Sequence, residues 1–481
     1  MEPVAERLIP RPLKLEMGNG VCHARTLRKI VLSADFPDAE KTLAKELDRC
    51  FRIAPVIEKN TVLKSLREEG YELHIGVDRI EIAASDHAGL LNSCKTLRQL
   101  AETEHGGGIV FPALKIEDHP ARKFRGIHIC VFPETTLTEL EKNLRLAAYH
   151  KFNYAVIEFW GNFPFESHPE LGWQDRRLDR NELKRILSVC RENGLIPIPQ
   201  FNILGHAAAA RAISGKHAFL YRHPEHAELF EPTYWSWCIS NPAVHSLLKD
   251  LVQELHDFFG RPPYFHIGCD EAEDLATCHL CRERPLSELL GSYLREFYEL
   301  FSIRNTRIIM WHDMLLNRND PRWKNFVANS KRPEMQNFYQ ALPRDIVIAD
   351  WEYGIPPEEK RGPGWPVSDF FRENGFETLL CPWDNEADMR SMSQYTWNGA
   401  ASGMLITTWH YLSDLKYTTF LTAGAYALWN PADNPGTTLM GRLATGRHLL
   451  EIAGDMDLKT YEDCGYSQYQ VPLLKHPHPL Y

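Results

Sequence analysis

The run FRGIHICV (Phe124–Val131) opens a region in which short apolar stretches alternate with longer amphipathic ones. Further apolar runs follow it, each ending in a polar or aromatic residue: Tyr154–Trp160, Leu195–Asn202, Tyr264–Asp270, Arg307–Asp313, Ile346–Tyr353, Glu377–Trp383 and Gly403–Trp409. Nearly continuous apolar strands separated by helices are typical of a parallel sheet that helices cover. Eight such units over about 300 residues favour a (β/α)8 barrel, an α/β fold, over an open sheet.

The stretches between the runs have the apolar spacing of helices. The clearest are Leu137–Phe152, Arg180–Asn193 and Pro242–Phe259, and Pro242 and Gly260 flank the third as start and stop signals. No glycine-rich phosphate loop follows the first run, which disfavours a dinucleotide-binding fold.

The residues ahead of the barrel predict a small α+β domain. Its expected elements are two helices, a hairpin turning at Asp78 and one further strand: Phe36–Phe51, His87–Glu102, Tyr71–Val77 with Arg79–Ala83, and Ile109–Ile116. We therefore expect a small domain over residues 1–118, a catalytic barrel over 119–435, and a C-terminal helix and tail over 436–481.

Composition excludes several classes of function. The 481 residues include 54 Lys and Arg against 64 Asp and Glu, a net charge of −10, so a nucleic-acid partner is not expected. No run of about 18 uncharged apolar residues exists, so we expect no membrane span. The first residues lack the apolar core of a signal peptide, which predicts a cytoplasmic protein whose eleven cysteines are mostly buried thiols.

Acidic and aromatic side chains gather at the ends of the apolar runs, where a barrel of this kind places its active site. The fourth run ends in Asp270 and is followed by Glu271, and the third leads into His206. Indoles end the last four runs: Trp311, Trp351, Trp383 and Trp409. Because aromatic faces stack on sugar rings and charged groups bind the hydroxyls, this set predicts a carbohydrate site. Arg125, in the first run, is either part of that site or a buried ion-pair partner of Asp118 or another acid.

The run HIGCDE (His266–Glu271) resembles the His-x-Gly-Gly-Asp-Glu signature of glycoside hydrolase family 20, the β-N-acetylhexosaminidases. Segments 115–129 and 193–209 resemble the family's entry to the barrel and its third strand. Thr96, Leu97, Gln99 and Leu100 echo a helix of its accessory domain. The resemblance covers roughly residues 30 to 430, and it implies a barrel preceded by a small α+β domain.

This resemblance implies a retaining mechanism in which the 2-acetamido group of the sugar is the nucleophile. Glu271 would be the general acid and base, with a raised pKa, and Asp270 would orient the acetamido N–H. Arg125 would hold the outer sugar hydroxyls, and His206 would support the acid. The remaining expected substrate contacts are Trp311, Trp351, Trp383, Asp384 and Trp409. No cofactor or metal is expected at this site, and the expected partner is a glycoside or oligosaccharide.

The sequence departs from the family pattern at four places. Leu204 replaces the proline of the family's third-strand Pro-Gly-His. Cys269 replaces the second glycine of the signature, and Asp384 follows Trp383 where the family usually has a tyrosine that holds the acetamido oxygen. Tyr353, Tyr395 and Tyr411 are the candidate replacements. An acid that follows the eighth-strand Trp in the family is also missing, because His410 follows Trp409.

Two alternative functions remain open at this stage. One is a β-glycosidase for sugars without the acetamido group, with Asp270 and Glu271 as acid and nucleophile. The other is a carbohydrate-binding protein with a degenerate glycosidase site. Separately, Cys278-x-x-Cys281 has the spacing of half a zinc site, which Cys190, Cys238 or Cys269 could complete, whereas the simpler interpretation is free thiols.

Overall fold

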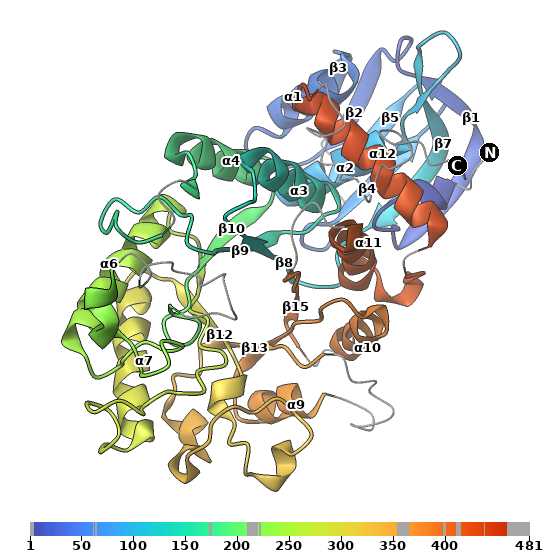
Figure 1. Ribbon diagram of the computed structural model, residues 1–481. Helices are drawn as coiled ribbons and strands as arrows, with labels where there is room; N and C mark the ends of the chain where they lie inside the picture. Colours follow the sequence, from blue (N-terminus) through green and yellow to red (C-terminus); the bar gives the residue numbers. More distant parts are fainter. Residues whose placement is uncertain are drawn as a thin grey trace, which may run out of the picture.

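The structure is a computed structural model that describes residues 4–60, 62, 65–172, 176–208, 220, 223–353, 365–397, 401–409, 415–436 and 438–458. A small sheet domain packs on one side of a closed parallel barrel, as predicted (Figure 1). Within these residues no helix combines the length and the apolar character that crossing a bilayer would require.

The small domain is a sheet in the order β1-β7-β4-β5-β2-β3, with β6 paired to β7. Its strands are β1 (Lys14–His23), β2 (Lys29–Ser33), β3 (Val56–Lys59), β4 (Tyr71–Ile75), β5 (Ile80–Ala84), β6 (Glu102–Thr103) and β7 (Ile109–Asp118), and its helices are α1 (Ala39–Phe51) and α2 (His87–Leu100). The predicted hairpin is the antiparallel pair β4–β5, and both predicted helices are present. Strands β1, β2, β3 and β6 were not predicted. Strand β1 is an exposed edge strand without an apolar face.

All eight predicted barrel strands are present. They are β8 (Phe124–Val131), β9 (Tyr154–Phe159), β10 (Ile196–Gln200), β11 (Tyr264–His266), β12 (Arg307–Trp311), β13 (Val347–Asp350), β14 (Glu377–Leu380) and β15 (Gly403–Ile406). Each is parallel to its neighbours, and β15 pairs with β8 to close the barrel. Side chains alternate between the barrel interior and the surrounding helices, so Phe124, Val156 and Ile309 fill the interior while Ile127 and Ile129 face the helices.

Helices surround the barrel. They are α3 (Leu137–Tyr149), α4 (Arg180–Glu192), α6 (Pro242–Phe258), α7 (Leu286–Ser302), α9 (Pro366–Glu373), α10 (Glu386–Trp397), α11 (Leu415–Trp429) and α12 (Leu439–Asp455). Short 3-10 helices are η1 (Val4–Arg7), η3 (Pro224–Leu229), η4 (Asp313–Leu315), η5 (Pro321–Trp323), η6 (Pro333–Met335), η7 (Phe338–Ala341) and η8 (Pro431–Asp433). Helix α6 begins as predicted, with Pro242 in the first turn after the Asn241 cap, and Gly260 follows its end at a φ of 73°.

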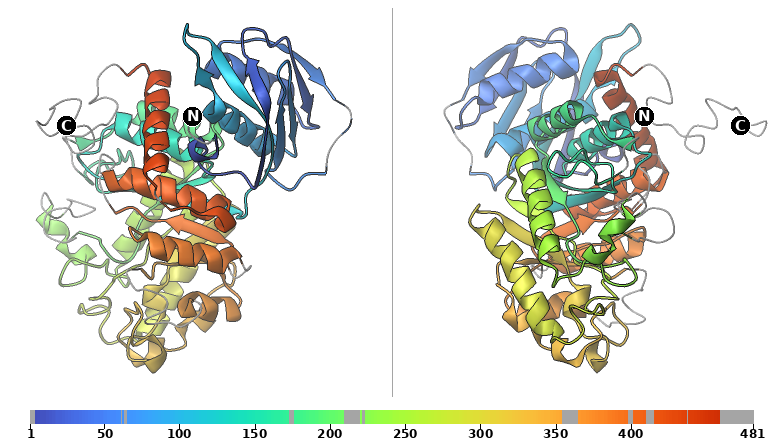
Figure 2. Two further views of the ribbon diagram at one scale, coloured as in Figure 1. Left: turned by 90° about the vertical axis from the view of Figure 1, so that its right-hand side faces the viewer. Right: turned by 60° about the vertical axis from the view of Figure 1, so that its left-hand side comes forward.

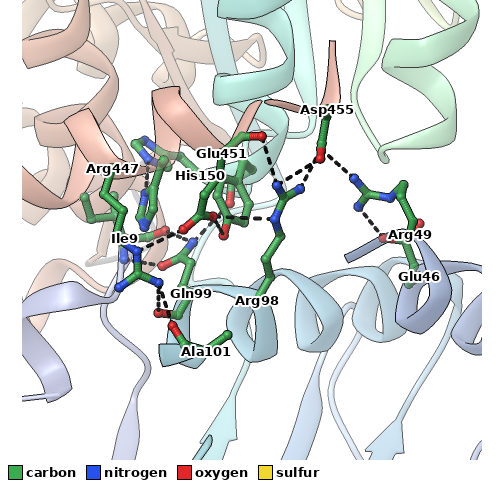
Figure 3. Close-up of polar contacts among 12 residues, drawn as sticks. Ile9, Glu46, Arg49, Arg98, Gln99, Ala101, His150, Arg447, Glu451 and Asp455 are labelled. Atoms are coloured by element: carbon green, nitrogen blue, oxygen red, sulfur yellow. Dashed lines mark hydrogen bonds and ion pairs between the residues drawn. The ribbon is translucent and has the colours of Figure 1, made fainter. Parts of the chain in front are cut away.

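Helix α12 lies beside both the small domain and the barrel (Figure 2). Its Asp455 accepts hydrogen bonds from Arg98 of α2 and Arg49 of α1, and its Arg447 donates to the carbonyls at the end of α2 (Figure 3). Gln99 donates to and accepts from the backbone of Ile9 at 2.9 and 2.8 Å. These contacts attach the chain's last described helix to its first described segment and to the small domain.

A buried network around Asp118 joins the small domain to the barrel. Asp118, at the end of β7, accepts hydrogen bonds from the Tyr71 hydroxyl at 2.7 Å, the Lys151 ammonium at 3.0 Å and the Trp429 indole at 2.8 Å. Tyr71 belongs to the small domain, whereas Lys151 follows α3 and Trp429 ends α11. One carboxylate shielded from water therefore contributes to the contact between the two units.

Candidate active site

Two loops at the carboxyl-terminal ends of β10 and β11 bring the predicted acids together. The Asn202 amide donates to Asp270 Oδ1 at 2.5 Å, and His206 Nε2 lies 3.1 Å from Asp270 Oδ2 and 3.4 Å from Glu271 Oε2. Asp270 is almost fully buried, whereas the Glu271 side chain keeps 22% of its surface exposed. The site thus contains one carboxylate with a hydrogen-bond partner at each oxygen and a second that remains accessible.

The loop that carries these acids is in a constrained backbone conformation. Gly268 has a φ of 68°, and a Cβ at this position would lie 2.6 Å from Cγ of Asn202, so only glycine lets Asn202 reach Asp270. Cys269 and Glu271 also have left-handed φ values, 72° and 48°, which are uncommon outside glycine. Such outliers concentrate where surrounding contacts hold the chain for function. The same conformation explains why a glycine suits position 269.

Two further residues fix the backbone of Glu271. Its N–H donates to Asp313 Oδ2 at 2.8 Å, and its carbonyl accepts a hydrogen bond from the Trp235 indole at 2.5 Å. Asp313 also accepts from the Trp351 indole at 2.9 Å and from the Asn329 amide at 2.8 Å. Because both peptide groups of Glu271 are anchored, its strained φ is maintained and the direction of its side chain is restricted.

Asp313 is a buried acid whose environment favours the protonated form. It has no exposed surface, and burial together with the nearby charge of Asp270 raises the pKa of Asp313 to about 6. The hydrogen bonds from Glu271 and Trp351 act in the opposite direction, because they stabilise the carboxylate.

This shift gives a testable pH dependence of stability. An unfolded Asp titrates near pH 3.9, so between about pH 4 and pH 6 folded Asp313 retains a proton that the unfolded chain has lost. The free energy of unfolding of the native protein, minus that of Asp313→Asn, should therefore fall by up to about 1.4 kcal/mol per pH unit across this window as pH rises. Above about pH 6 this difference in the free energy of unfolding should no longer change with pH. Urea unfolding at a series of pH values measures the difference, and parallel curves would contradict the raised pKa.

Aromatic side chains from the last strand ends form a connected group next to the acids. The Tyr353 ring lies 5.4 Å from Trp351 and 5.3 Å from Trp383, between ring centroids. Burial and the negative charges of Asp270 and Glu271 raise the pKa of Tyr353. Trp409 is partly exposed and lies 4.5 Å from the ring of His128. Asp384, beyond Trp383, is exposed, and its role in binding stays a prediction.

Trp311 ends β12, as predicted, and its side chain lies in the barrel interior. Its side chain has no exposed surface, and its ring packs against His266 at 4.4 Å and Trp409 at 5.9 Å. The residue belongs to the interior cluster of the barrel because its position on β12 points inward. Trp311 therefore supports Trp409 and His266, and its contact with a sugar stays a prediction.

Arg125 also lies elsewhere. It is the second residue of β8, at the amino-terminal end of the barrel, and it points outward because its neighbour Phe124 fills the interior. Its guanidinium pairs with Glu69 of the small domain and donates to the carbonyls of Arg122 and Lys151. The assignment of Arg125 to sugar binding is therefore wrong, and the alternative of a buried ion pair with an acid other than Asp118 is correct.

The three candidate tyrosines differ in their position relative to the acids. Tyr353 is next to the acids, whereas the Tyr395 hydroxyl donates to Asp369 of α9, and Tyr411 lies outside the described residues. His410 also lies outside them. Among these positions Tyr353 is the described residue in reach of the site.

Sequence reasoning missed several contributors. Asn202 and Asp313 end predicted strands, so the criterion that selected Asp270 would also have selected them. Trp235 lies in an irregular segment before α6, and no pattern marks it. Glu158 is buried at the end of β9, where it accepts hydrogen bonds from Gln200 at 2.8 Å and Trp160 at 3.2 Å. It also forms, with His128 and Cys130, a group whose geometry could hold a cation.

Comparison with known proteins places the chain in a family. Two family models match: glycosyl hydrolase family 20, domain 2, over residues 5–119, and glycosyl hydrolase family 20, catalytic domain, over residues 167–354. The second match includes the loop that carries the two acids and the loop that carries Asn202 and His206, and the two matches together cover more than half of the chain.

Curated relatives agree with these matches. The β-hexosaminidase of Vibrio furnissii is 25% identical over 352 residues, which are 64% of this chain and 57% of the relative. The β-N-acetylhexosaminidase of Cellulomonas fimi is 25% identical over 297 residues, or 55% of this chain and 59% of the relative. The chain thus spans less than two thirds of the length of these relatives.

Solved structures share the fold. An exo β-N-acetylglucosaminidase from Vibrio harveyi, in complex with N-acetylglucosamine, superposes with a TM-score of 0.69 at 16% identity, over 94% of this chain and 78% of that one. The chitobiase of Flavobacterium johnsoniae superposes with a TM-score of 0.70 at 17% identity, over 96% of this chain and 75% of that one. With two matching models of one family, in the order small domain then barrel, the chain belongs to glycosyl hydrolase family 20.

Proposed function

We propose that the protein is an exo-acting, retaining β-N-acetylhexosaminidase that removes terminal N-acetylhexosamine from glycosides. The observation that carries this proposal is the pairing of buried Asp270 with accessible Glu271, both within 3.4 Å of His206. The aromatic group of Trp351, Tyr353 and Trp383 beside them suits a sugar ring and its acetamido group.

In the proposed first step, the acetamido carbonyl oxygen bonds to the anomeric carbon while the glycosidic C–O bond breaks. Glu271 gives its proton to the leaving oxygen, and the product is a cyclic oxazolinium ion. Asp270 accepts a hydrogen bond from the acetamido N–H and stabilises its positive charge. Water then attacks the anomeric carbon, Glu271 takes up its proton, and the acetamido group is restored. These steps need no cofactor.

The environment of Asp270 argues against the rival glycosidase, in which this acid would attack the sugar. Asn202 and His206 contact both of its oxygens, which suits an orienting acceptor and weakens a nucleophile. The two acids are also adjacent in sequence, whereas an ordinary retaining pair lies on opposite sides of the bond, roughly 5 Å apart.

Hydrolysis of p-nitrophenyl N-acetyl-β-D-glucosaminide and its galacto epimer by the purified chain tests the proposal. We expect release of the β-anomer first, by proton NMR, and strong inhibition by a thiazoline that mimics the cyclic ion. Equal turnover of the glucoside without the acetamido group would favour the rival glycosidase. Binding of N-acetylglucosamine without any turnover would favour a carbohydrate-binding protein.

Tyr353→Phe should lower kcat/KM for the acetamido substrate by about 10² to 10³-fold, the usual loss when one donor to a developing charge is removed. The reason is that the hydroxyl would hold the acetamido oxygen while it attacks. Tyr395→Phe is the matched control, because that hydroxyl pairs with Asp369 away from the acids. Equal effects of the two substitutions on initial rates would exclude this role for Tyr353.

A further inference from the structure

A second group of reactive side chains lies outside the acid site. Cys238, Cys278 and Cys281 are buried together with the carboxylate of Glu231, and one ligand atom from each lies within 4.8 Å of the others. We call these four residues the Cys3Glu cluster. It unites the Cys278-x-x-Cys281 pair with a cysteine about forty residues earlier in the chain.

The sulfur spacing fits a shared cation better than a disulfide. Cys238 Sγ lies 3.4 Å from Cys278 Sγ and 3.7 Å from Cys281 Sγ. A disulfide bond would bring two sulfurs to about 2.0 Å and leave the third unpaired. Tetrahedral zinc, with Zn–S bonds of about 2.3 Å, places sulfurs about 3.8 Å apart. The two distances from Cys238 Sγ to the other sulfurs are close to this value, so the three sulfurs are spaced as in a metal site.

Glu231 can supply the fourth ligand. It has no exposed surface and accepts backbone N–H groups of the loop that carries the cysteine pair, Thr277 and Cys278 at Oε2 and Ala276 at Oε1. Within the part of the chain that the structure describes, Oε1 accepts one hydrogen bond, from Ala276 at 3.1 Å, which leaves it a lone pair for a cation. His279, between the two cysteines, is exposed and is not part of the cluster.

We propose that the Cys3Glu cluster binds one Zn²⁺ ion as a structural site. Binding replaces three S–H bonds by Zn–S bonds and releases the three protons to solvent. Thiolate and carboxylate ligands in a closed, four-coordinate set are typical of structural zinc. This inference is independent of the proposed activity, and it replaces the expectation of free thiols at Cys278 and Cys281.

The position of the cluster gives the metal a consequence for the acid site. Cys238 lies three residues after Trp235, which holds the carbonyl of Glu271, and Cys278 lies seven residues after Glu271. The ion would therefore join the β10–α6 loop to the β11–α7 loop directly behind the two acids. Loss of the ion should loosen that loop pair.

The experiment measures metal on the full chain, purified without chelators and reconstituted with Zn²⁺. We expect elemental mass spectrometry to find about one zinc per chain. A mercurial reagent that blocks the thiols should release this zinc. Substitution by Co²⁺ should give the strong visible absorption of a tetrahedral thiolate site. Cys278→Ser and Cys281→Ser should each lower zinc content at least tenfold, and Glu231→Gln should weaken affinity by about tenfold or more.

Cys190→Ser is the matched control, since Cys190 is equally buried on α4 and should leave zinc content unchanged. The cobalt spectrum of the native chain tests the site even where a cysteine variant fails to fold. Zinc below about 0.1 per chain after reconstitution, or a disulfide between two of the three cysteines in the fresh protein, would overturn the proposal.

Discussion

Glu271→Gln should reduce kcat by about 10² to 10⁴-fold for a substrate with a poor leaving group, the range that general acid–base catalysis supplies. Glutamine fits the same space and keeps a polar end near His206, but it can neither protonate the glycosidic oxygen nor activate water. The anchoring of the Glu271 backbone by Asp313 and Trp235 is unaffected, because it involves peptide atoms alone. The loss should therefore appear in kcat with KM little raised.

Leaving-group chemistry separates this role from general damage to the site. A dinitrophenyl glycoside needs less protonation, so the defect of Glu271→Gln in the first step should shrink with that substrate. Glu273→Gln is the matched control, because Glu273 is an exposed acid on the same loop whose partner is the surface residue Lys331. An equal loss with both leaving groups, or in both variants, would contradict the assignment of Glu271 as the acid.

Asp118→Asn should lower the free energy of unfolding by about 3–5 kcal/mol, the usual cost of breaking one side of a buried ion pair. Lys151 would then be buried without its counter-charge, and Tyr71 and Trp429 would lose part of a charged acceptor. Burial lowers the pKa of Lys151, and the charge of Asp118 opposes that shift. The variant should thus also weaken the attachment of the small domain. Urea unfolding at pH 7 measures the change.

Two companion variants show whether the charge is responsible. The double variant Asp118→Asn with Lys151→Met removes both charges and should recover part of the loss, because buried pairs are costly mainly when half of the pair remains. Glu117→Gln, one residue earlier on β7, breaks an exposed pair with Lys14 and should leave the unfolding midpoint nearly unchanged. A double variant no more stable than Asp118→Asn would assign the effect to packing.

The barrel was predictable because its signal is local and repeated. Every parallel strand is buried on both faces, so each one appears in the sequence as an apolar run, and its end marks the catalytic edge. The candidate site residues Asp270, Glu271 and His206 were selected in this way. Strand β1 escaped prediction, because an exposed strand at a sheet edge has no apolar pattern to reveal it.

The sequence by itself determined the strand count of the barrel, the order of small domain and barrel, and the candidate pair of acids, because these depend on residues close together in the chain. Only the tertiary structure decided which side of a strand each residue occupies. The tertiary structure pairs Arg125 with Glu69 and buries Trp311. It also places Asp313 and Trp235 where they hydrogen-bond the backbone of Glu271. It also brought Cys238 to the Cys278–Cys281 pair. Contacts between distant segments follow from how strands and loops pack in space, and the order of residues in one chain does not encode them locally.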